Sequence, residues 1–76
     1  MTWEWQYHSN PQRWTLTVGE WSAVVQRVEG PRYLWRPSIE RTTEPYDRRE
    51  GSLSNDAANG RTWCLSEIAK MRSQRA

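Results

Sequence analysis

Hydrophobic and polar positions alternate along the first forty residues of the chain, and this alternation is typical of strands with one buried face. It is clearest over residues 13–18, where every second residue is apolar. The pattern predicts three strands within residues 13–40 and a further strand within residues 2–8. Turn-forming residues at 9–12, 19–20 and 29–31 separate these segments. We therefore expect an antiparallel meander of three to four strands.

Two of the predicted strands carry a signal about their place in the sheet. Residues 21–28 include the apolar run Ala23, Val24 and Val25, which favours a central strand or a bulge that shifts which side chains face the core. The strand within 33–40 contains Pro37, which has no N–H group to donate to a neighbouring strand. We therefore expect this last strand to lie at an edge.

The second half of the chain predicts a loop and then a helix. Residues 41–53 are rich in charge and contain Pro45 and Gly51, so we expect a mobile loop without a regular element. Helical periodicity over residues 54–74 predicts a helix that begins near Ser54, a residue type that often caps helices. Gly60, inside this helix, indicates a close approach to the sheet, for which a Trp is a candidate.

The expected fold class is α+β, with the meander packed against one C-terminal helix. The chain has 76 residues, which is enough for a single domain over 1–76. It contains six Trp and no Phe, so large Trp rings have to supply much of the buried surface. The predicted core consists of Trp14, Leu16, Val25, Trp35, Ile39, Cys64, Leu65 and Ile68.

The inventory of reactive side chains argues against an enzyme. His8 is the only histidine and Cys64 the only cysteine, so ordinary zinc spacing and an intrachain disulfide are both excluded. Cys64 lies on the apolar helix face, which favours an inert thiol. We expect no catalytic residues, no metal, no cofactor and no small-molecule substrate. The chain shows no signal core or membrane span, and we expect a cytoplasmic protein.

The polar face of the meander is the first candidate for a binding surface. Ten of the eleven basic side chains are Arg, which pairs with phosphate and with guanine, while Gln pairs with adenine. A GC-rich genome would also raise the Arg content, and a polar outer face is common in soluble α+β domains, so a solvated surface is the alternative. The residues proposed for nucleic-acid binding are Arg13, Thr15, Thr17, Gln26, Arg32 and Arg36.

Aromatic side chains form the second candidate surface. Trp3, Trp5 and Tyr7 alternate with polar residues, and Trp63 lies opposite the apolar stripe of the predicted helix. If residues 2–8 pair as a strand, this aromatic ridge joins the core, and this is the form that we favour. If they do not, the ridge is exposed and favours binding to a protein or to a second copy of the chain.

The chain also resembles a known group of proteins. The Trp3-x-Trp5 pair, the Trp-bearing meander and the Trp63-Cys64 pair before a helix end are similar to small Trp-rich uncharacterised proteins of bacterial prophage regions. This resemblance implies a fold and a phage context but no activity. The order of strands and helix is also similar to the N-terminal DNA-binding domains of phage-type tyrosine recombinases. Those domains are more basic than this chain, in which Glu20, Glu29 and Glu40 dilute the charge.

Overall fold

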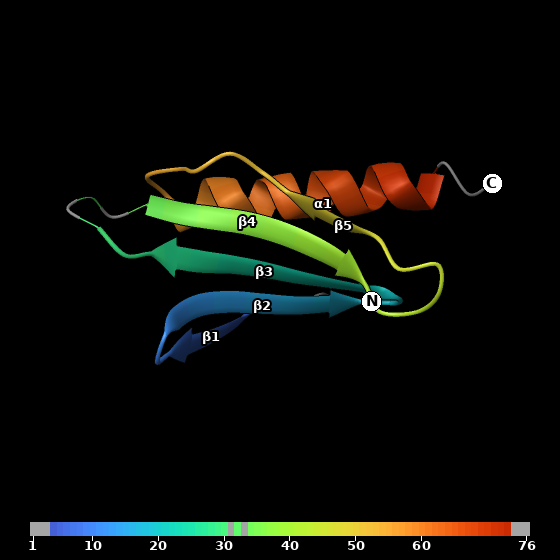
Figure 1. Cartoon of the computed structure of the whole chain (residues 1–76), viewed down its shortest axis with the longest axis horizontal. Helices are drawn as coiled ribbons and strands as arrows, with labels where there is room; N and C mark the ends of the chain where they lie inside the picture. Colours follow the sequence, from blue (N-terminus) through green and yellow to red (C-terminus); the bar gives the residue numbers. More distant parts are fainter. Residues whose placement is uncertain (1–3, 31, 33, 74–76) are drawn as a thin grey trace.

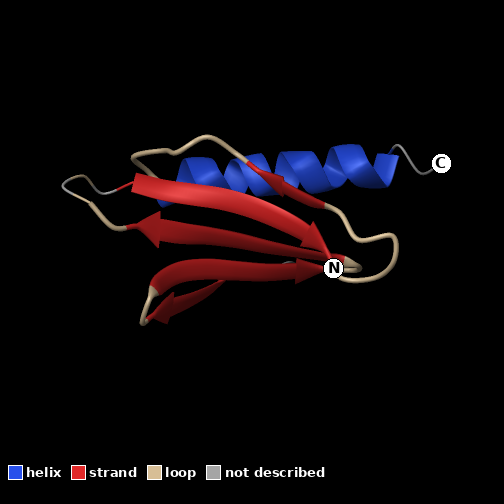
Figure 2. Cartoon of the chain, in the orientation of Figure 1, coloured by secondary structure: helices blue, strands red, loops and turns tan. Residues whose placement is uncertain are grey.

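The computed structural model describes residues 4–30, 32 and 34–73 and confirms an α+β fold. Within these residues, five antiparallel strands follow one another in sequence order across one sheet, and a single helix covers part of one face (Figures 1 and 2). The sheet therefore has five strands, against the three to four expected. The elements are β1 (Gln6–Ser9), β2 (Gln12–Val18), β3 (Trp21–Val28), β4 (Leu34–Arg41), β5 (Arg48–Glu50) and α1 (Ala57–Ser73).

The N-terminal segment pairs as a strand, as the favoured prediction required. β1 runs antiparallel to β2, with Tyr7 opposite Trp14, and residues 10–11 form a short turn between the strands. The described strand begins at Gln6 rather than near residue 2, and Trp3 lies outside the described residues. The aromatic side of β1 thus lies on the same face of the sheet as the core.

A two-residue turn connects β2 to β3 at Gly19 and Glu20, as predicted. Gly19 has a φ of 57°, a left-handed conformation that favours glycine, and Val18 pairs with Trp21 directly across this turn. The register then places Leu16 opposite Ala23 on the helix side of the sheet. β3 lies in the middle of the five strands, which confirms its predicted central position.

The prediction that β4 is an edge strand is wrong, because β5 pairs with it along its second half. The same strand corrects the expectation of a loop without a regular element over residues 41–53. Gly51 N donates a hydrogen bond to Pro37 O at 2.9 Å, so the backbone polar groups of Pro37 point toward β5 and away from β3. The missing N–H of Pro37 therefore removes no hydrogen bond from the β3–β4 pair. β5 itself ends at Glu50, next to this position.

The helix begins at Ala57, three residues later than predicted. Ser54 cannot cap the helix because its backbone forms a β-bridge with Trp35. Trp35 N donates a hydrogen bond to Ser54 O at 2.7 Å, and Ser54 N donates one to Trp35 O at 3.0 Å. Asp56 takes the capping role, since its Oδ1 accepts a hydrogen bond from Ala58 N at 2.9 Å. The predicted last residue, Gln74, lies outside the described residues. No helix in the described part of the chain is long and apolar enough to cross a membrane.

The core lies between α1 and the strands β3 and β4. Gly60 permits the close approach that was predicted, but the neighbour is Val25, not a Trp: a Cβ on Gly60 would lie 2.8 Å from Val25 Cγ1. Five of the predicted core residues are buried, while Trp14, Trp35 and Leu65 are half-buried at its rim. The buried apolar residues are Leu16, Val18, Trp21, Ala23, Val25, Ile39, Cys64, Ile68 and Met71.

Candidate nucleic-acid interface

The face of the sheet away from α1 carries polar side chains that line up across neighbouring strands. His8 pairs with Arg13, Arg13 with Gln26, and Gln26 with Arg36. Because paired residues of an antiparallel sheet point to the same side, these four side chains form one row across β1–β4. We call them the basic row. With strands about 4.8 Å apart, the row spans about 14 Å.

The side chains of the basic row differ in how firmly they are held. Arg13 Nη1 donates a hydrogen bond to Pro11 O at 3.1 Å, and His8 Nε2 lies 3.0 Å from Thr15 Oγ1. Arg36 is exposed and forms no ion pair with any residue that the structure describes. A guanidinium has five N–H donors, so Arg13 keeps donors for a ligand while one of them holds the turn.

The rest of the outer face is less basic than this row. The next row contains Thr15 and Glu50, and the row beyond it contains Thr17 and Glu40. Arg48 lies at that end as well, but its guanidinium is paired with Glu50 at 2.9 Å. Positive charge on the outer face is therefore concentrated at the end where β1 turns into β2.

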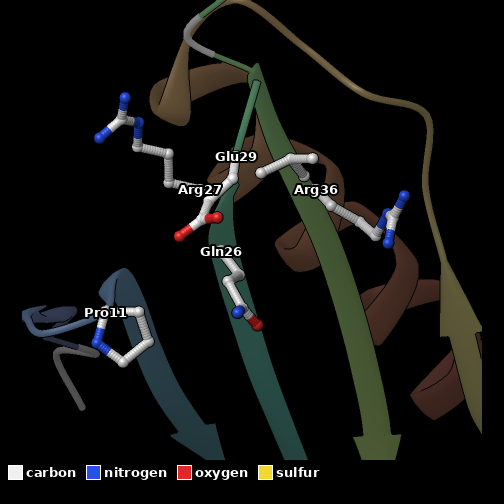
Figure 3. A pocket seen from close by; sticks show the side chains of 6 residues that line it. Pro11, Gln26, Arg27, Glu29 and Arg36 are labelled. Atoms are coloured by element: carbon white, nitrogen blue, oxygen red, sulfur yellow. The ribbon is translucent and has the colours of Figure 1, made fainter. Parts of the chain in front are cut away.

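A shallow hollow of about 340 Å³ adjoins the basic row between Pro11, Gln26 and Arg36. Figure 3 shows that the guanidinium groups of Arg27 and Arg36 point to opposite sides of this hollow. Glu29 also lines it and brings a carboxylate. An anion in the hollow would meet this carboxylate, so the hollow alone is no anion site. The row of side chains on the open face is the stronger candidate.

The structure brings together three of the six residues that were predicted to bind nucleic acid. Arg13, Gln26 and Arg36 lie in the basic row, and Thr15 and Thr17 lie on the same face in the following rows. The sixth residue, Arg32, is exposed in the connection between β3 and β4 and lies outside the row. His8 was not predicted as a member, because its place in the row follows from the pairing of β1 with β2.

The structure separates the aromatic residues that were proposed as one interaction surface. Tyr7 is 47% exposed, and the centre of its ring lies 5.0 Å from the centre of the Trp14 ring. Trp5 packs against the rim of the core. Trp63 is half-buried beside Gly51, which follows β5 at the opposite edge of the sheet from β1. Trp63 therefore does not extend a surface formed by Trp5 and Tyr7, and Trp3 lies outside the described residues.

The reactive side chains of the described part of the chain include metal-ligating residue types and the Cys64 thiol. No group of three His, Cys, Asp or Glu residues there is arranged to hold a metal ion. Cys64 is fully buried, and this burial raises the pKa of its thiol to about 12. A thiol with so high a pKa is a poor nucleophile near neutral pH.

No family model, curated protein or solved structure matches the chain. The resemblance to small prophage proteins and the similarity to recombinase DNA-binding domains therefore stay predictions. Evidence for a function therefore comes from the side chains of this chain and from their arrangement.

Proposed function

We propose that the protein is a small nucleic-acid-binding module, of the kind found in phages and prophages, which contacts duplex DNA through the outer face of its sheet. The observation that carries this proposal is the basic row, in which Arg13 and Arg36 flank Gln26 across three adjacent strands. Arg forms paired hydrogen bonds with guanine and binds phosphate, and Gln forms paired hydrogen bonds with adenine. The protein would act in the cytoplasm, where duplex DNA is available and a single thiol such as Cys64 stays reduced.

The size of the row fits a duplex. The major groove is about 12 Å wide, and Arg13 and Arg36 lie two strand spacings, about 10 Å, apart, so their long side chains can reach phosphates on either side of the groove. Gln26, between these two Arg residues, then lies over the base edges. The hydroxyl groups of Thr15 and Thr17 continue the contact along β2 toward the sugar–phosphate backbone.

Titration of the protein with random-sequence duplex DNA at 50 and 200 mM salt tests the proposal. If Arg13, Arg32 and Arg36 each neutralise one phosphate, the logarithm of the binding constant should fall with a slope of about −2.7 against the logarithm of salt concentration. The affinity should then drop about 40-fold between the two salt concentrations. Absence of binding at 50 mM salt would refute the proposal.

A pair of charge-matched variants locates the surface. Arg13→Gln with Arg36→Gln removes two charges from the basic row and should reduce the salt slope by about 1.8. Lys70→Gln with Arg72→Gln removes the same charge from exposed positions of α1, on the other side of the sheet, and serves as the control. The proposal requires a much larger loss of affinity in the first variant. Equal losses would mean that only net charge matters, and would contradict binding by the basic row.

A further inference from the structure

The two edge strands of the sheet differ in chemistry. All three residues of β5 are charged, whereas β1 has the sequence Gln-Tyr-His-Ser, with no Arg, Lys, Asp, Glu or Pro. Charged residues and proline are the usual means by which proteins prevent an edge strand from pairing with another chain. β5 is therefore protected, and β1 presents its free backbone N–H and C=O groups without such protection.

The helix side of the sheet is also open next to β1. α1 packs on β3 and β4 and leaves β1 beyond its reach, as Figure 1 shows. The cover over β2 comes from side chains: the Arg61 guanidinium lies 4.5 Å from the centre of the Trp14 ring. Tyr7, at the edge, keeps 47% of its surface exposed. An aromatic ring and an unpaired strand edge thus occur at the same place.

We propose that β1 pairs antiparallel with β1 of a second copy of this chain, around a twofold axis at Tyr7. In this register Tyr7 faces Tyr7 of the second copy, so each ring covers the exposed ring of the other. Gln6 faces His8 of the second copy, and no like charges lie opposite each other. Cross-strand aromatic pairs stabilise antiparallel sheets, and like charges in facing positions destabilise them.

Pairing of β1 with β1 of a second copy is more favourable than the other two ways of joining the edge strands. The same twofold arrangement at β5 would place Arg49 opposite Arg49 of the second copy. Pairing of β1 with β5 of another copy would leave free edges at both ends, so the chains would continue into open polymers. Pairing of β1 with itself uses both unprotected edges and stops at two chains. It leaves only the protected β5 strands at the outside.

The dimer should be weak, because the contact is small. A strand of four residues is about 13 Å long and offers only a few backbone hydrogen bonds. Interfaces of this size belong to the transient class, so we expect a dissociation constant on the order of 10–100 μM. The two sheets would join into one, with both basic rows on the same face. This last consequence rests on the proposed function, whereas the pairing itself is tested without DNA.

Sedimentation equilibrium of the DNA-free protein from about 5 μM to about 1 mM, a range that brackets the expected dissociation constant, measures the association. We expect a reversible monomer–dimer equilibrium that Gln6→Lys with His8→Lys abolishes, because each new Lys faces a Lys of the second copy. Asn59→Lys with Ser66→Lys adds the same charge at exposed helix positions and should leave the equilibrium unchanged. A monomer at the highest concentration, growth into polymers, or equal effects of the two variants would each overturn the proposal. Circular dichroism melts confirm that both variants are folded.

Disulfide capture tests the register directly and does not depend on the lysine variants. Facing residues of an antiparallel pair have Cα atoms about 4.5 or 5.5 Å apart, which lies within the range that a disulfide spans. Tyr7→Cys should therefore form a covalent dimer under mild oxidation, at least tenfold faster than Thr17→Cys, which is exposed on β2. Cys64 can stay in place because it is buried. Equal rates for the two cysteines would contradict pairing at Tyr7.

Discussion

Replacement of Gly60 by Ala tests the closest contact between helix and sheet. In an isolated helix this change is favourable by about 1 kcal/mol, because Ala loses less backbone entropy than Gly. In this protein the new Cβ would lie 2.8 Å from Val25 Cγ1 and 3.6 Å from Pro37 Cβ. The optimal distance between carbon atoms is about 3.5–4.0 Å, so the helix would have to move away from β3 by roughly 1 Å.

The two effects have opposite signs, and the structure indicates which is larger. Val25 is fully buried in the central strand and has no room to retreat. Overpacking at such positions costs about 1–3 kcal/mol, which exceeds the gain in helix propensity. We expect Gly60→Ala to lower the free energy of unfolding by about 1 kcal/mol and the melting temperature by about 4–8 °C.

Urea denaturation followed by Trp fluorescence and circular dichroism measures this change. Val25→Ala alone should cost about 2–3 kcal/mol, through two lost methyl groups and a cavity. In that background the Cβ introduced by Gly60→Ala has space, so the same substitution should become stabilising. Asn59→Ala, at an exposed helix position, gives the propensity effect without the contact. If Gly60→Ala stabilises the parent chain and the Val25→Ala variant equally, the helix does not approach the sheet as described.

Three further predictions follow from buried or paired groups. Trp21→Ala should destabilise the fold by about 3–5 kcal/mol and leave a molten chain, whereas Trp35→Ala, at a half-buried ring, should cost less; the reverse order in urea melts would contradict the core. Glu20→Gln should cost about 0.5–1 kcal/mol, because Glu20 Oε2 accepts a hydrogen bond from Arg41 Nε at 2.6 Å; high salt should reduce this cost. The pKa of the Cys64 thiol is about 12 in the folded chain against 9.0 when unfolded. The neutral thiol therefore contributes stability that is fully present below pH 9 and is lost as the pH rises toward 12. Cys64→Ala should therefore lose less stability between pH 9 and 12 than the parent chain.

The alternation of apolar and polar residues predicted most of the sheet, because each strand buries one face. The Gly19–Glu20 turn and the central place of β3 followed from local signals of the same kind. β5 was not predicted, because all of its residues are charged and it forms through backbone pairing with β4. A strand that buries no side chain leaves no hydrophobic pattern in the sequence.

The start of the helix shows how tertiary contacts choose between local signals. Ser54 and Asp56 are both good capping residues, and helical periodicity does not separate them. The backbone bridge between Ser54 and Trp35 holds Ser54 in the sheet, so Asp56 caps the helix. Tertiary contacts also explain the error at Trp63, which helical periodicity predicted to lie on the solvent side of the helix. The return of the chain through Gly51 gives this ring a neighbour that the helical periodicity could not show.

The sequence was enough to predict that the candidate interface lies on the polar face of the sheet, but not that its side chains line up in the basic row. Strand alternation was enough to place Arg13, Thr15 and Thr17 on the polar side of β2. Which side chains face one another depends on the register between strands, and the turns fix that register. The alignment of Arg13 with Gln26 and Arg36 therefore became visible only with the pairing of β2, β3 and β4.

The mismatch between one helix and five strands connects the stability of this protein with its candidate surfaces. A helix is about 10 Å in diameter, while five strands at about 4.8 Å spacing are about 19 Å across, so one helix can cover only two or three of them. Trp63 fills the space beside Gly51, and Trp14 with Arg61 covers β2. Large Trp rings therefore cover parts of the sheet that the single helix α1 does not reach. The cover ends before β1, and this leaves the Tyr7 ring exposed on the helix side of the sheet, next to the unpaired edge of β1.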